Sequence, residues 1–191
     1  VSGSNEYKAA GYCLLHPPAY RTEVFFDDLE AYERADKQGY RKDEHLKRVE
    51  IGGEAKEVFA SMFFSCKSLE KVVLPRTLER IGDYAFADCV SLEDVTDLSM
   101  LNLKSIGTSA FENCVNLGEI QFPDTLQKLG EDAFKNAFNW KEKASVVLPE
   151  SVTEVSLTCF ENAEINELVW NASAECIEPE TFYECLFLEN V

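Results

Sequence analysis

The chain has 191 residues, of which 46% are hydrophobic and 13 are phenylalanine, so it can build a sizeable core and is not expected to be disordered. Its 18 Lys and Arg against 35 Asp and Glu give a net charge of −17, which argues against nucleic acid and anionic membrane surfaces as partners, since both attract positive charge. No apolar run approaches the roughly 18 residues needed to cross a bilayer, so no membrane insertion is expected within this segment.

Residues 1–45 are predicted to form an irregular segment that ends in one helix. The chain begins at Val1 without a signal peptide, so we expect that its N-terminus has been processed or trimmed. Glycine and proline interrupt the chain up to residue 21. From Thr22 to Gln38 apolar residues such as Phe25 and Leu29 recur at helical spacing, with acidic residues largely on the other face. We predict a helix here that caps the open end of the region from residue 46 onward.

The rest of the chain repeats itself. The stretch Ile81–Val95 returns as Ile106–Ile120, and self-similarity at a fixed spacing indicates stacked copies of one unit. A partial copy at Leu46–Ile51 precedes six copies spaced by 22 to 26 residues, which start at Val58, Ile81, Ile106, Leu129, Val155 and Ile177. The second copy is stretched near Met100. Because the sixth stops within a strand at Val191, we expect further repeats or another chain to cover that edge.

Each copy predicts one strand and one turn. In Leu-x-x-Val-x-Leu the last apolar residues alternate with exposed ones, which is the period of a strand with one buried face. Pro75, Pro123 and Pro149 follow three of these strands and are expected to end them. The next stretch, Ile-Gly-x-x-Ala-Phe-x-x-Cys, has the spacing of a short helix or 3₁₀ turn with Phe and Cys inward. The sequence therefore predicts a short curved rod of stacked coils.

The string Cys-x-x-Leu-x-x-Val-x-Leu-Pro-x-x-Leu-x-x-Ile-Gly-x-x-Ala-Phe-x-x-Cys resembles the BspA-like (Treponema-type) leucine-rich repeats over about residues 46–191. The chain departs from that pattern at Ala137, Trp140 and Ala163. The resemblance implies an α/β fold: a right-handed solenoid with a short parallel sheet on the concave face and short helices or 3₁₀ turns on the convex face. It also implies protein recognition or adhesion, often at a cell surface, without catalysis.

Seven cysteines raise the question of disulfides. Four of them share one repeat position, which alanine fills at 137 and 163: Cys66, Cys89, Cys114 and Cys185. We predict that these are buried thiols whose S–H donates weakly to a turn carbonyl. Cys13, Cys159 and Cys176 lie off this position, and a bridge between Cys159 and Cys176 on adjacent coils remains an alternative.

The sequence offers little for catalysis or metal binding. Cys13-Leu-Leu-His16 has the spacing of half a zinc site, but no second such pair exists in the sequence. The other histidine, His45, is expected to be exposed. Because no Ser/His/Asp or Cys/His constellation is evident, we predict that the chain is not an enzyme and takes no cofactor or metal.

The candidate functional surface is the outward row of the sheet on the concave face. Concave solenoid faces are extended surfaces that suit protein partners. Three exposed valines among acidic residues would fit a protein interface, although single exposed valines are also ordinary in strands. The row is predicted to contain Arg48, Glu50, Lys71, Val73, Asp94, Thr96, Glu119, Gln121, Ser145, Val147, Glu167, Val169 and Asn190.

The favoured function is therefore a non-enzymatic recognition or adhesion module that binds a protein through this concave row, and a basic partner would suit the charge. The alternative is a structural subunit or scaffold in a larger intracellular or organellar assembly. Asn171-Ala-Ser173 is a glycosylation acceptor pattern at Asn171, meaningful if the chain enters a secretory route. A cell-surface or secreted location is favoured over an intracellular or organellar one.

Overall fold

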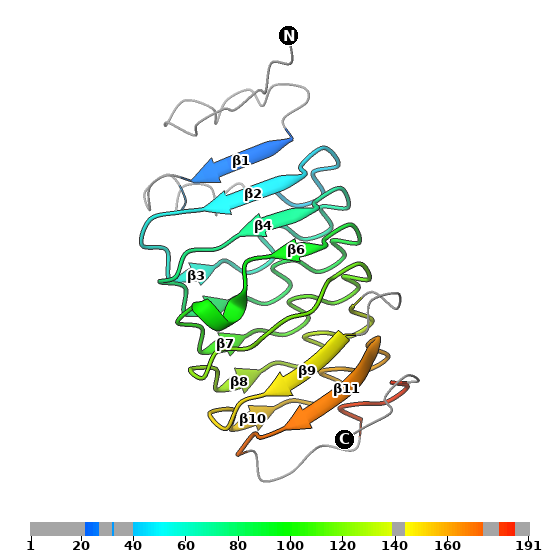
Figure 1. Cartoon of the computed structure of the whole chain (residues 1–191). Coiled ribbons are helices and arrows are strands. Elements are labelled where there is room, and N and C mark those ends of the chain that lie inside the picture. The colour runs from blue at the N-terminus through cyan, green and yellow to red at the C-terminus, as the bar shows by residue number, and fades with distance from the viewer. Residues whose placement is uncertain (1–21, 27–31, 33–39, 139–143, 174–179, 186–191) are drawn as a thin grey trace.

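The molecule is a stack of coils along one axis, with strands on two of its sides (Figure 1). The structure is a computed structural model, and it describes residues 22–26, 32, 40–138, 144–173 and 180–185. Every strand pairing among these residues is parallel, and each strand pairs with the equivalent strand of a neighbouring coil. The predicted solenoid with parallel sheets is therefore confirmed.

One side of the stack carries the longer strands. A four-stranded sheet has the order β1-β2-β4-β6, and a two-stranded sheet of β9 and β11 lies further along the same side (Figure 1). The sheets consist of β1 (Glu23–Phe26), β2 (Arg48–Ile51), β4 (Lys71–Val73), β6 (Asp94–Val95), β9 (Ala144–Leu148) and β11 (Ile165–Trp170).

A second side carries a five-stranded sheet that the sequence analysis did not predict. Its order is β10-β8-β7-β5-β3, and its strands are β3 (Glu57–Val58), β5 (Arg80–Ile81), β7 (Ser105–Ile106), β8 (Lys128–Leu129) and β10 (Glu154–Val155). In register, Val58 pairs with Ile81, Ile81 with Ile106, Ile106 with Leu129 and Leu129 with Val155. These are the predicted starts of consecutive copies, so the repeat alignment of the first five copies is confirmed.

The predicted helix at Thr22–Gln38 is wrong at Glu23–Phe26. Residues Glu23–Phe26 form the strand β1, which pairs in parallel with β2, and Val24 and Phe26 point into the core. The edge of β2 offers unpaired backbone groups, and the sequence Glu-Val-Phe-Phe suits a strand with alternate buried residues. Tyr32 has a helical conformation, and the rest of the predicted helix up to Gln38 lies outside the described residues. The division of the chain at residue 45 remains a prediction.

The predicted convex helices are also not seen among the described residues, which form a series of tight turns there. Tyr84 (φ 57°) and Asp88 (φ 61°) adopt the left-handed conformation, and equivalent residues of the other described coils do the same. A right-handed helix cannot continue through such residues. The backbone N–H groups instead reach the next coil: Phe86 N–H donates to the carbonyl of Ala110 at 2.9 Å. The 3₁₀ helix η1 (Leu98–Met100) lies in the stretched part of the second copy.

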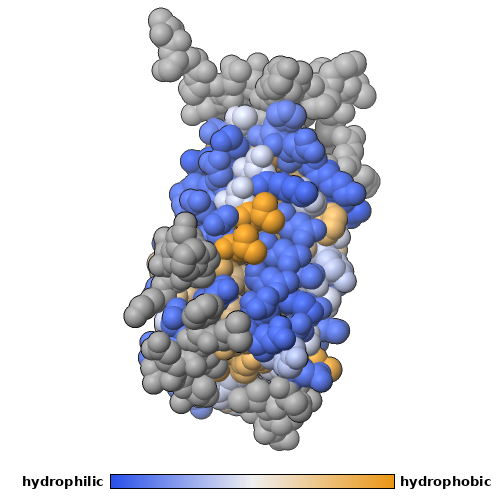
Figure 2. Space-filling model, turned by 90° about the vertical axis from the view of Figure 1, so that its right-hand side faces the viewer, coloured by the Kyte–Doolittle hydropathy of each residue, from blue (hydrophilic) through white to orange (hydrophobic). Residues whose placement is uncertain are grey.

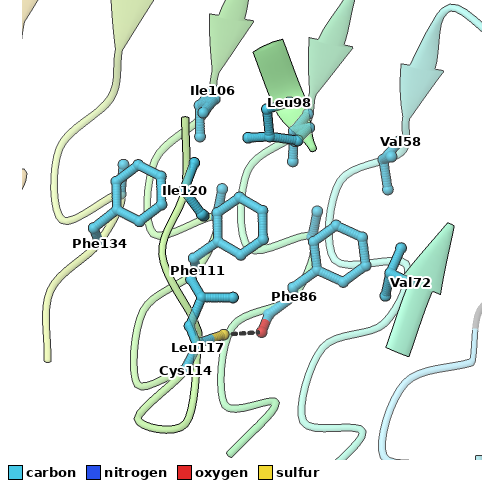
Figure 3. Packing of buried hydrophobic residues seen from close by; sticks show 14 of the residues in the cluster. Val58, Val72, Phe86, Leu98, Ile106, Phe111, Cys114, Leu117, Ile120 and Phe134 are labelled. Atoms are coloured by element: carbon cyan, nitrogen blue, oxygen red, sulfur yellow. Dashed lines mark hydrogen bonds between the residues drawn. The ribbon is translucent and has the colours of Figure 1, made fainter. Parts of the chain in front are cut away.

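The core is a column of phenylalanines that runs through the stack. Their ring centroids lie 5.3 to 5.5 Å apart with interplanar angles of 5° to 19°, and the column consists of Phe63, Phe86, Phe111, Phe134, Phe160 and Phe182. Three of these rings are seen side by side in Figure 3. Each coil thus contributes one ring that packs on those of its neighbours, which fixes the stacking of the coils.

Candidate protein-binding face

The predicted outward row lies on the side of the longer strands, which we call the strand face. It comprises the outward residues of β2, β4, β6, the segment 118–122, β9 and β11. Along β2 and β9 outward residues such as Glu50 and Val147 are half-buried or exposed, while Val49 and Val146 between them are fully buried. The period-two alternation therefore places the row at the surface, and its role in binding remains a prediction. Asn190 lies outside the described residues.

Charges on the N-terminal part of the strand face are paired with one another. Lys71 forms an ion pair with Asp94 on the neighbouring strand. Arg48 contacts Glu50 at 3.0 Å and lies over the ring of Phe25, 5.7 Å from its centroid. These contacts neutralise the basic residues of the row, so they leave little positive charge on this face for an acidic partner.

One member of the row has a structural role. Thr96 accepts a hydrogen bond from the Leu74 N–H through its hydroxyl oxygen at 2.8 Å, so it fastens the end of β4 to the next coil. Val73 is half-buried. The Thr96 hydroxyl is therefore already engaged within the molecule, while Val73 is less exposed than the valines at 147 and 169.

An exposed apolar pair marks the C-terminal part of the strand face. Val147 on β9 is 43% exposed and Val169 on β11 is 37% exposed. The two residues are partners in register, so their side chains are neighbours on one face of the sheet. Ser145 and Glu167 are the next outward-facing pair in that register. This part of the row combines adjacent apolar residues with an acidic one.

A groove of about 780 Å³ opens on this side of the molecule. Five predicted residues line it: Glu119, Gln121, Ser145, Val147 and Asn171. The segment 118–122 forms part of its wall and is not a strand, although the repeat pattern predicts one there. The structure therefore brings part of the row and the glycosylation candidate together around one hollow.

The groove also contains residues that the sequence analysis missed. Ser99 comes from η1, Asp124 follows the segment 118–122, and Glu150 follows β9. Ser173 lines the same groove, and its hydroxyl donates to the Glu150 carbonyl at 2.8 Å. The stretch of extra residues near Met100 was a signal that the coil is irregular here. The extra residues did not indicate that strand pairing would be interrupted next to this coil.

The prediction that the cysteines at the shared repeat position are packed thiols is confirmed. The thiols of Cys89 and Cys114 donate to the carbonyls of Phe63 and Phe86, each at 3.2 Å, and the second of these bonds is drawn in Figure 3. Burial raises the pKa of Cys66 to about 12, and it raises the pKa of Cys114 further still. Thiols held in this protonated form are poor nucleophiles and poor metal ligands.

The remaining candidates for chemistry gain no support. Cys159 is a free, fully buried thiol, while its suggested partner Cys176 lies outside the described residues, as do Cys13 and His16. His45 is exposed. Within the described ranges no group of three or more His, Cys, Asp or Glu residues could hold a metal ion. The same ranges contain no helix long and apolar enough to span a membrane.

The edge of the stack where the longer strands begin is largely hydrophilic, with a small hydrophobic patch near its middle (Figure 2). The five-stranded sheet is covered by ion pairs between coils, such as those of Glu79 with Lys56 at 3.3 Å and with Lys104 at 2.7 Å. Hydrogen bonds from these lysines hold the pKa of Glu79 below its usual range. These charged groups next to the five-stranded sheet are therefore paired within the molecule.

Comparison with known proteins identifies the repeat. The sequence profile of the BspA type leucine-rich repeat region, with 6 copies, matches residues 35–142 and 104–191. No curated protein matches the chain significantly.

Solved structures of bacterial repeat proteins have the same fold. A leucine-rich-repeat protein of T. pallidum is 29% identical with a TM-score of 0.68, over 75% of this chain and 67% of that one. One from Bacteroides ovatus is 24% identical with a TM-score of 0.66, and the chain covers 38% of its length. A leucine-rich cell surface protein of Faecalibacterium prausnitzii is 18% identical with a TM-score of 0.53, over 82% of this chain and 45% of that one. On the match of its repeats, the chain belongs to the BspA-type leucine-rich-repeat family.

Proposed function

We propose that this chain is a non-enzymatic recognition module that binds a protein partner through the C-terminal part of its strand face. The observation that carries the proposal is the exposed pair of Val147 and Val169, adjacent on β9 and β11 and next to the groove. Exposed apolar side chains with an acidic surround have the mixed composition of protein interfaces. Repeat solenoids commonly use such extended surfaces for binding.

The context of the family supports a role in recognition. Leucine-rich-repeat proteins are typically non-enzymatic and bind proteins, and the similar structure from F. prausnitzii is described as a cell surface protein. We propose a surface or secreted location for this chain on that basis. In such a location Asn171, which is exposed just after β11, would be open to modification.

The proposal is tested by replacing the apolar pair with polar, uncharged residues. Peptides selected from a random display library on the wild-type chain are expected to lose binding to Val147→Ser combined with Val169→Ser, because the apolar contact would be lost. Val115→Ser is the matched control, since Val115 is also 43% exposed but follows Cys114 in a turn. The readout is the dissociation constant from fluorescence anisotropy. Equal affinity for the double variant and the wild type would contradict this face.

The alternative of a scaffold subunit predicts a different result. A fixed partner in a larger assembly would co-purify with constant stoichiometry, and its binding would not depend on the valine pair. Cross-linking the native protein before purification, followed by intact mass measurement, distinguishes the two functions.

A further inference from the structure

The strand side of the molecule is not one continuous sheet. The four-stranded sheet ends at β6 and the two-stranded sheet begins at β9, so each has an edge toward the coil between them (Figure 1). That coil contains the segment 118–122. The Gly118 N–H donates to the Glu93 carbonyl at 3.2 Å, but among the described residues none of the backbone N–H groups from Glu119 to Phe122 has a partner.

Such unpaired backbone groups are available to an added chain. Extended peptides bind many proteins by hydrogen bonding to an exposed strand-like segment, and alternate side chains then enter pockets. The groove runs along this segment and along β9, with Ile120, Phe122 and Pro149 as buried apolar lining. A segment of a partner in extended conformation fits these two features.

The charge of the groove selects the kind of segment. Glu119, Asp124 and Glu150 are exposed on its wall, and among the described residues none of these carboxylates has an ion-pair partner. None of the described lining residues is basic. This differs from the N-terminal part of the strand face, where Lys71 and Arg48 already pair with acidic neighbours. The overall charge of −17 would also steer a positively charged segment toward the molecule.

We propose that the groove between the segment 118–122 and β9 binds an extended, lysine- or arginine-bearing segment of a partner protein. Backbone groups of Glu119–Phe122 pair with the backbone of the bound segment. Its cationic side chains lie among Glu119, Asp124 and Glu150, and an intervening apolar side chain contacts Val147. This inference rests on the proposed recognition function and specifies the class of the partner.

The probe is a fluorescein-labelled nine-residue peptide of alternating lysine and valine, compared with the same peptide carrying glutamate in place of lysine. We expect the wild-type chain to bind the lysine peptide and not the glutamate peptide. Glu119→Gln combined with Glu150→Gln is expected to weaken binding about fivefold, which is the effect of losing two exposed ion pairs. The matched control, Glu54→Gln with Glu131→Gln, changes the net charge equally at exposed sites outside the groove.

A control variant that weakens binding as much as the groove variant would overturn the proposal, because the attraction would then be the overall charge alone. Only alternate backbone amides of a bound strand face the segment 118–122, so one lysine peptide is N-methylated at its odd amides and another at its even amides. Binding retained by both peptides would contradict the strand-like mode. The recognition function is tested separately from the preference for a basic segment. If the selected peptides depend on Val147 and Val169 but not on Glu119 and Glu150, the strand face binds and the preference for a basic segment is wrong. If they depend on neither pair, both proposals are wrong.

Discussion

At the scale of single residues, two repeat positions hold consecutive coils together. The phenylalanine position supplies a column of stacked rings, and neighbouring aromatic rings add about 0.5–1.5 kcal/mol each beyond the area they bury. The cysteine position supplies a thiol that reaches the carbonyl of the preceding coil, as Cys66 does toward Tyr40 at 2.8 Å. Both are contacts between coils, so a substitution at either position affects neighbouring repeats as well as its own.

The cysteine position predicts how stability depends on pH. Burial raises the pKa of Cys66 from an ordinary value of 9.0 to about 12, so the native state keeps a proton that the unfolded state releases. The stabilisation by this thiol is complete below about pH 9 and is lost as the pH rises toward 12. Over this pH range the free energy of unfolding should therefore fall more steeply in the wild type than in Cys66→Ala. The difference between the two slopes is expected to be up to about 1.4 kcal/mol per pH unit.

Urea unfolding from pH 8 to 11 provides the measurement. Alanine fills the same repeat position at Ala137 and Ala163, so the variant is expected to fold. Cys185→Ala is a second test, because the pKa of Cys185 is also raised, to about 11, so its profile should differ from the wild type in the same direction over this range. Parallel pH profiles for the wild type and Cys66→Ala would show that the buried thiol is not linked to folding.

At the scale of the element, the turns of each coil are built on polar residues in the left-handed conformation. Asn113 donates to Asp88 at 2.8 Å, Asn136 donates to Asn113 at 2.8 Å, and Asn162 donates to Asn136 at 2.7 Å. All four residues have φ between 51° and 61°. Asparagine and aspartate tolerate this conformation and can bond to one another along the stack. The ladder explains why the turns replace the helix that the phenylalanine and cysteine spacing predicted.

The second feature at this scale is that glycine-containing turns of neighbouring coils approach one another closely. A Cβ atom at Gly107 would lie 2.8 Å from the Asp83 nitrogen and 2.9 Å from the carbonyl carbon of Gly82, both backbone atoms. Gly107→Ala is therefore expected to destabilise the chain by about 1–3 kcal/mol or more, since the coils would have to separate. Urea unfolding at neutral pH measures the loss.

Ser156→Ala is the matched control for this prediction. Ser156 occupies the equivalent position two coils later, where its N–H donates to Leu129 as the N–H of Gly107 donates to Ile81, and a Cβ atom is already accommodated there. A loss for Gly107→Ala no larger than that for Ser156→Ala would contradict the close-approach explanation.

At the scale of the whole molecule, the stack is a one-dimensional array in which contacts between strands join neighbouring coils. Repeat proteins of this kind open from their ends, because a terminal coil has one neighbour and an internal coil has two. The whole chain has a charge of −17, and the carboxylates of the groove, which have no ion-pair partner among the described residues, give one side a local acidic field.

This organisation predicts a gradient of hydrogen exchange. The N–H groups of Phe86 and Phe111, which donate to the coils that come after them, are expected to exchange most slowly. The N–H of Phe160, which donates to Thr181, should exchange faster because it lies closer to the C-terminal end of the described stack. Exchange followed by mass spectrometry at neutral pH measures the order. Uniform protection along the chain would indicate a single cooperative unit instead.

The repeat, its register and its inward residues could all be predicted from the amino-acid sequence. Period-two alternation in residues such as Val72 and Val146, and the regular return of Phe and Cys, reflect burial against the adjacent coil, and burial follows directly from residue type. The same alternation placed Glu119, Val147 and the other described members of the row at the surface. These features are local and repeated, so a single chain contains several copies of the same signal.

The remaining features depend on tertiary contacts. The residues Glu23–Phe26 lie at the start of a longer stretch with apolar residues at helical spacing, yet they form a strand because the edge of β2 supplies hydrogen-bond partners. The turns depend on bonds between coils such as that of Phe86 to Ala110, which no single repeat can show. The groove exists because the segment 118–122 passes between two sheets without pairing. Such pairing depends on how neighbouring coils meet in space, and the spacing of residues along one coil does not specify it.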